Sequence, residues 1–269
     1  MRTALKISTL NALVFIAMLS ISGMLSGALS DIAYYLAFLL PVGITFAYKS
    51  RTGMPFTVIK PRFKKKDALL FLPTVFPVIA LIFAFSYLTS LILTLAGAEN
   101  SNPDVSGDIY RAIFSYAVLP ALLEELLFRF VIIGVILPHS KRGAIIFSAL
   151  FFSLAHCNLF QIPYAFLAGI LFALIDVYSE SILPSVILHL INNVTSVLWL
   201  RGFNNPEFKT VFVLILFGVA LVSSVCLFAL RHSYKTRLVE ITKKEDKLFL
   251  PPEVVVFLVV ALILSISII

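Results

Sequence analysis

The chain has 269 residues, of which 60% are hydrophobic and 13% are charged, and its mean hydropathy is +1.03. Soluble domains are about 45–50% apolar and about 25% charged, so this composition excludes an ordinary soluble protein. The net charge of +7 does not predict nucleic-acid binding, because the basic residues lie in short connections between apolar runs. Cys157 and Cys226 form neither a disulfide framework nor a CxxC metal pair.

Apolar runs of about 20 residues recur along the whole chain, and each is long enough to cross a bilayer as a helix. We therefore predict one integral membrane domain over residues 1–269, folded as an all-α polytopic transmembrane helix bundle with about 8–9 spans. In chain order the predicted spans are 7–29, 32–48, 68–96, 110–137, 143–157, 162–178, 182–200, 209–230 and 252–269. The first run has features of a cleaved signal peptide but is long for one, which favours a retained helix.

The basic residues are distributed unevenly between the two sides of the predicted bundle. The connections that lie on the side of the N-terminus hold two, seven, two and six of the 21 Lys and Arg residues, in segments 1–6, 49–67, 138–142 and 231–251. The opposite connection 97–109 is acidic. Cytoplasmic connections carry an excess of Lys and Arg, so we predict a cytoplasmic N-terminus in a protein surrounded by membrane lipids. Orientation alone explains the basic residues, although the 49–67 segment could also bind anionic lipid head groups.

The predicted span 110–137 contains three charged residues, Glu124, Glu125 and Arg129. Each charge near the centre of a membrane helix costs about 2.5–3.5 kcal/mol on insertion scales, so such residues are functional candidates. Glu125 and Arg129 are four residues apart, which predicts an ion pair on one helix face. Glu124 lies about 100° round the helix and has no cation there, which leaves it available as a general base. Pro120, one turn earlier, is expected to bend the helix.

Two later spans each bring a histidine to membrane depth. Helical spacing places Phe152 and His156 on one face, and His189 and Asn193 on another. Two chemistries are compatible with these residues. Glu124, His156 and His189 could bind Zn²⁺ with a fourth position open for water. Alternatively, Glu124 and His156 could activate a water molecule directly, while His189 and Asn193 hydrogen-bond the developing oxyanion. The absence of HExxH favours the second chemistry.

These residues form three ordered motifs, which are EExxxR (Glu124, Glu125, Arg129), FxxxH (Phe152, His156) and HxxxN (His189, Asn193). In this order the chain resembles the CPBP family of CAAX prenyl endopeptidases and bacteriocin-processing intramembrane proteases, over a core of about residues 110–200. The resemblance implies peptide-bond hydrolysis within the membrane. It assigns water activation to Glu124 with His156, the oxyanion site to His189 with Asn193, and support of the site to Glu125 and Arg129.

The alternatives are a non-catalytic membrane scaffold or immunity protein with the same fold, and a proton-coupled transporter that uses Glu124 and His156 as a relay. For the protease we expect a peptide or membrane-protein substrate and a bacterial plasma membrane location. A shared site requires the predicted span 143–157 to be short or tilted, because His156 lies at its end whereas Glu124 lies near the middle of its own span.

Overall fold

The computed structural model describes residues 1–62, 65–100, 103, 105–202, 205–229 and 252–266. Within these residues all regular structure is helical, apart from one isolated bridge between Lys60 and Ser181. Six of the described helices are long and apolar enough to cross a membrane. They are α1 (Arg2–Met24), α2 (Ala28–Thr52), α3 (Lys65–Leu95), α8 (Ile162–Ser179), α9 (Leu183–Arg201) and α10 (Pro206–Ala229). The predicted all-α membrane bundle is confirmed.

The other predicted spans are shorter or interrupted helices. Helix α7 (Lys141–Leu154) has 14 residues, which corresponds to about 21 Å and is less than the roughly 30 Å of a hydrocarbon core. It ends three residues before the predicted end of its span, so His156 lies in the connection that follows. The last helix is α12 (Pro252–Ile266), with 15 residues. The basic segment 231–251, with His232, lies outside the described residues.

The segment that carries the two glutamates is one continuous helical path with two wide turns. It consists of α4 (Ile109–Ile113), η1 (Phe114–Val118), α5 (Leu119–Glu125), η2 (Leu126–Ile133) and α6 (Gly134–Ile136), where η denotes a π-helix. The amide of Leu119 bonds the carbonyl of Phe114, five residues back. Pro120 is predicted to disturb the helix, and a π turn indeed ends just before it. Proline has no N–H group, so it cannot donate the backbone hydrogen bond of a regular α-turn.

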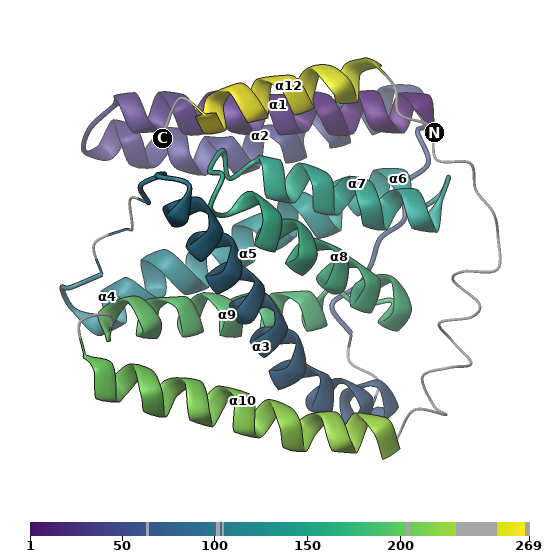
Figure 1. Ribbon diagram of the computed structural model, residues 1–269. Helices are drawn as coiled ribbons and strands as arrows, with labels where there is room; N and C mark the ends of the chain where they lie inside the picture. The colour runs from purple at the N-terminus through teal and green to yellow at the C-terminus, as the bar shows by residue number, and fades with distance from the viewer. Residues whose placement is uncertain (63–64, 101–102, 104, 203–204, 230–251, 267–269) are drawn as a thin grey trace.

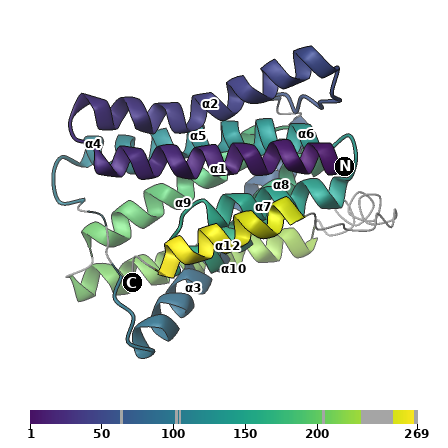
Figure 2. The same ribbon diagram turned by 90° about the horizontal axis from the view of Figure 1, so that it is seen from above.

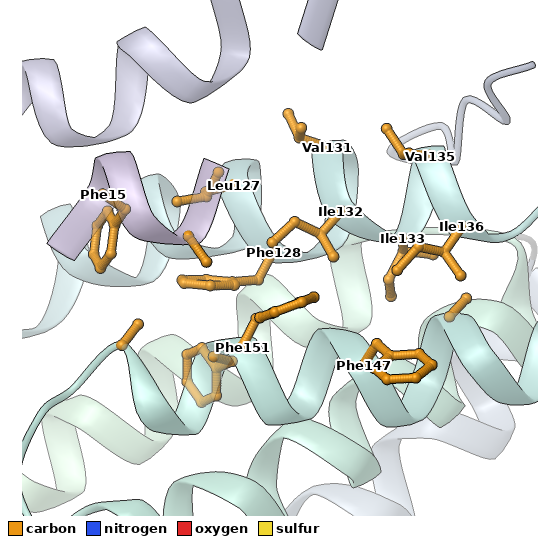
Figure 3. Close-up of a cluster of buried hydrophobic side chains, with 14 of the residues drawn as sticks. Phe15, Leu127, Phe128, Val131, Ile132, Ile133, Val135, Ile136, Phe147 and Phe151 are labelled. Atoms are coloured by element: carbon orange, nitrogen blue, oxygen red, sulfur yellow. The ribbon is translucent and has the colours of Figure 1, made fainter. Parts of the chain in front are cut away.

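The largest buried cluster lies where η2 and α6 pack on α7. Figure 3 shows Phe128, Ile132, Ile133 and Ile136 on the side that faces Phe147 and Phe151 of α7. Phe15 of α1 contacts the ring of Phe128, with centroids 5.7 Å apart. This packing holds the glutamate helix between α1 and α7.

Helices α1, α2 and α12 run side by side along one edge of the molecule, and α10 lies at the opposite edge (Figures 1 and 2). Between them, α5 packs on α9, and α3 crosses the bundle obliquely while it contacts α8, α9 and α10. The centre of the molecule is therefore enclosed by α3, α5, α8 and α9.

Helices α7 and α8 approach each other closely at Gly169. A Cβ atom built on Gly169 would lie 2.9 Å from Cα and 3.0 Å from Cβ of Ala149 on α7. Small residues at such contacts let membrane helices pack backbone against backbone, where van der Waals packing is a main source of stability. Gly169 thereby fixes the position of α7, whose end carries Phe152.

We predict that Gly169→Ala lowers the thermal stability of the purified protein in detergent, because the new methyl group forces α7 and α8 apart. Gly218→Ala on α10 is the matched control, since a Cβ atom there meets nothing within 4 Å. Melting temperatures of the two variants should differ by several degrees, with only Gly169→Ala below the wild type. Equal melting temperatures would contradict the close helix contact.

Candidate active site

A buried ion pair lies at the junction of α5 and η2. Glu125 Oε2 is 3.3 Å from Arg129 Nε, and both side chains are fully buried. The ion pair predicted from the i, i+4 spacing is therefore confirmed. Removing two charges from water is costly, so each partner needs the other and further polar contacts as well.

Arg129 makes two more contacts, both with α7. Its Nη1 donates to the hydroxyl of Ser148 at 3.3 Å, and that hydroxyl in turn donates to the carbonyl of Phe128 at 2.9 Å. The guanidinium also lies over the ring of Phe152, 4.8 Å from its centroid. A desolvated cation over an aromatic face is stabilised by the ring quadrupole. Arg129 thus links the FxxxH motif to the EExxxR motif.

Glu125 also binds the histidine of the third motif. His189 Nδ1 lies 2.8 Å from Glu125 Oε1, and the His189 residue is 4% exposed. A carboxylate that is paired with an arginine can only accept, so Nδ1 carries the proton and donates it to Glu125. Nε2 then points away from Glu125. The shortest contact of His189 is therefore with Glu125, whereas the sequence had suggested Glu124.

Glu124 faces the other side of the same imidazole. Its Oε2 lies 3.7 Å from His189 Nε2, too far for a hydrogen bond, and its side chain is 17% exposed. Within the described residues this buried oxygen has no hydrogen-bond partner. Glu124 lines a cavity of about 920 Å³. A carboxylate with an unpartnered oxygen in such a cavity is placed to accept a proton from a bound molecule.

His156 lines the same cavity from the connection after α7. Its Nδ1 lies 2.8 Å from the carbonyl of Phe152, one turn earlier. Because a carbonyl only accepts, this bond places the proton on Nδ1 and leaves the lone pair of Nε2 available. The ring of Phe152 packs edge-on against the imidazoles of both His156 and His189, with centroids 5.0 and 5.5 Å apart.

Asn193 lines the cavity one turn after His189 on α9, as the spacing predicts, and Asn192 lines it as well. Asn192 Nδ2 lies 3.4 Å from Asn193 Oδ1. With its oxygen accepting from Asn192, Asn193 has its Nδ2 hydrogens available as donors. The cavity therefore contains a carboxylate, two imidazoles and a free amide donor.

The predicted zinc set fits this geometry only in part. The 3.7 Å between Glu124 Oε2 and His189 Nε2 could accommodate a metal ion with bonds of about 2.0–2.1 Å, and the Glu125–His189 bond is the usual outer contact of a ligand histidine. In the part of the chain that the structure describes, however, no three His, Cys, Asp or Glu side chains lie together as a metal requires. We therefore derive no step through a metal, and zinc remains an untested prediction.

Comparison with known proteins finds a relation for the segment that carries the three motifs. Residues 107–195 match the model of the type II CAAX prenyl endopeptidase Rce1-like family, and this segment contains all three motifs. The chain is also similar to the membrane-embedded CAAX protease MroQ of Staphylococcus aureus, with 30% identity over 128 residues, which cover 42% of this chain and 52% of the relative. Residues 107–195 are thus similar to the CPBP, or CAAX-protease-like, family.

The chain spans about half the length of this curated relative. No solved structure matches the chain significantly. The family match extends from Gly107, one residue before the N-cap of α4, into α9, so it includes the glutamate helix, α7 and α8 but not α3.

Asp176 is a buried carboxyl close to the site that the sequence pattern did not single out. It is fully buried near the end of α8, and its Oδ1 accepts the amide of Ser185 at 3.1 Å. Ser185 lies in the first turn of α9, so Asp176 caps that helix from a neighbouring one. His189 follows one turn later. A lone aspartate in an apolar span was the available signal, but the span gave no indication of its partner.

We predict that Arg129→Met lowers the free energy of unfolding by about 3–5 kcal/mol, because it leaves Glu125 buried without its cation. The double variant Glu125→Gln/Arg129→Met should recover more than half of this loss, since the second change removes the unpaired charge. Equilibrium unfolding in mixed micelles measures both. A loss below about 1 kcal/mol for Arg129→Met would contradict the burial of the pair.

Proposed function

We propose that this chain is an intramembrane endopeptidase in which Glu124 activates the attacking water. The observation that carries the proposal is the unpartnered Glu124 Oε2 in a cavity lined also by His156, His189 and Asn193. The similarity of residues 107–195 to the CAAX-protease-like family supports hydrolysis of a peptide bond. By the same reasoning the substrate is a peptide or a membrane protein.

In this proposal a water molecule bound between Glu124 and His156 attacks the carbonyl carbon of the scissile bond. Glu124 takes one proton from the water as the new C–O bond forms. The proton then passes to the nitrogen of the leaving amine, and the C–N bond breaks to give a carboxylic acid and an amine. The lone pair at His156 Nε2 accepts the second hydrogen of the water and orients it.

The oxyanion is stabilised from α9. Asn193 supplies its free Nδ2 hydrogens, and His189 supplies a second donor from Nε2 when the imidazole is doubly protonated. The buried Glu125 carboxylate accepts from His189 Nδ1 and fixes the ring, and Arg129 pairs with Glu125. Glu125 and Arg129 are thus positioning residues that act through His189.

Glu124→Gln is predicted to abolish cleavage of a peptide library, by at least about 10³-fold, because glutamine cannot accept the proton of water. The purified variant should elute and melt as the wild type does. Glu207→Gln is the matched control, because it removes one acidic charge at an exposed position in the first turn of α10. Zinc content measured on the same preparations tests the metal alternative.

Retention of cleavage by Glu124→Gln would reject this role for Glu124. If no peptide is cleaved by the wild type and Glu124→Gln still complements a deletion phenotype, the chain is a scaffold of the same fold. Uptake driven by a pH gradient in liposomes, without peptide cleavage, would instead identify a transporter.

The proposed setting is a bacterial plasma membrane with the N-terminus in the cytoplasm, and the excess of Lys and Arg in the 49–67 connection supports this orientation. We predict that a cysteine at Ser50, in a background without Cys157 and Cys226, reacts with an impermeant maleimide only after the cells are opened. A cysteine at Gly107 should react in intact cells. Both positions are exposed, so accessibility alone does not distinguish them. The reverse labelling pattern would invert the orientation.

A further inference from the structure

The wall of the cavity formed by α3 carries a row of hydroxyl groups. Ser86, Ser90 and Thr94 follow one another at intervals of four residues on α3, and all three line the cavity that contains Glu124. They lie outside the segment matched by the family, which begins at residue 107. The proposed chemistry uses none of them.

These hydroxyls differ from most others on the helices of this protein. A serine or threonine in an apolar helix usually donates to the carbonyl of its own preceding turn. Thr89 on the same helix bonds the carbonyl of Phe85 at 2.9 Å in this way, and Ser224 on α10 bonds that of Ala220 at 2.8 Å. Within the described residues, the hydroxyl groups of Ser86, Ser90 and Thr94 make no hydrogen bond. Three hydroxyl groups, each able to accept from an amide or donate to a carbonyl, are therefore available to a bound molecule.

The spacing of the row matches that of an extended polypeptide. Four residues along an α-helix correspond to about 6.0 Å, and two residues along an extended chain to about 6.6 Å. Backbone groups on one side of an extended peptide recur every two residues, so consecutive groups can meet consecutive hydroxyls over a short segment. Such a segment would lie between α3 and the α5–α9 wall that carries Glu124 and His189.

At membrane depth, the row of hydroxyl groups can stabilise the backbone of a bound peptide. An unwound peptide shielded from water must find partners for its amides and carbonyls, because each unsatisfied group costs several kcal/mol. A lipid acyl chain has no polar groups and gains nothing from three hydroxyls. The chemistry of this wall therefore favours a peptide backbone over a lipid tail.

We infer that Ser86, Ser90 and Thr94 form a binding subsite that holds the backbone of the substrate in an extended conformation opposite Glu124. This inference rests on the proposed peptidase function, which it extends by assigning the residues that bind the substrate. It also implies that the protein selects an unwound segment, with little dependence of this contact on side-chain identity.

The test uses the library peptide that the wild type cleaves fastest and analogues of it in which one backbone amide at a time is replaced by an ester. Ser90→Ala and Ser86→Ala should each raise KM for the amide peptide about three- to tenfold and leave kcat within about twofold, as expected for the loss of one hydrogen bond. Thr94→Val removes the third hydroxyl without loss of volume. Ser224→Ala is the matched control and should change neither constant.

The ester analogues identify the backbone as the partner. Against the ester that lacks the amide bound by Ser90, the wild type should already show a raised KM, and Ser90→Ala should raise it no further. Two results would overturn the inference: the hydroxyl variants raise KM equally for the amide peptide and for every ester, or none of the three variants changes KM. Neither result would affect Glu124-dependent cleavage.

A binding measurement separates this inference from the proposed function. Fluorescence anisotropy of labelled library peptides with Glu124→Gln protein requires no turnover. When Ser86→Ala and Ser90→Ala are combined with Glu124→Gln, the Kd for the peptide should rise by the product of the factors that each serine change causes alone. If the wild type cleaves no peptide, this loss of binding still supports the subsite, and equal affinities reject it.

Discussion

The site depends on one buried charge network, in which Glu125 accepts from His189 and pairs with Arg129. Away from water, each member needs the others, because an unpaired charge at that depth costs several kcal/mol. This dependence determines the helix arrangement. The network ties η2 to α7 through Ser148 and Phe152, and ties α5 to α9 through His189. The same contacts orient the imidazole whose free edge faces Glu124.

The two glutamates therefore have different roles despite being adjacent. Glu125 is fully buried, and its oxygens are directed toward His189 and Arg129. Glu124 faces the cavity with one oxygen unpartnered. One residue of helical rotation separates a carboxylate held in the charge network from one that faces the cavity. The π-helix η1 precedes the short helix that ends with the two glutamates, and the π-helix η2 follows it. The backbone on both sides of the pair therefore departs from regular α geometry.

Much of this arrangement could be predicted from sequence, because its signals are local. Apolar runs revealed the helices, and the spacing of Glu125 and Arg129 revealed their ion pair. The bond between Glu125 and His189 could not be predicted, since helical periodicity gives the face of a residue but not the rotation of one helix against another. Asp176 was missed for a similar reason, because its partner is a backbone amide of the next helix.

The shortness of α7 affects how water, the second reactant of the proposed hydrolysis, reaches the site. Hydrolysis consumes one water per bond, and the hydrocarbon layer excludes water. A helix of 14 residues leaves about 9 Å of a 30 Å layer uncrossed, so the chain turns back before it reaches the far surface. The hydrophobic layer must thin over this turn, or polar groups must line it, because a helix shorter than the bilayer draws the interface inward. In the proposed reaction, such a depression over the connection that contains His156 would bring solvent toward Glu124.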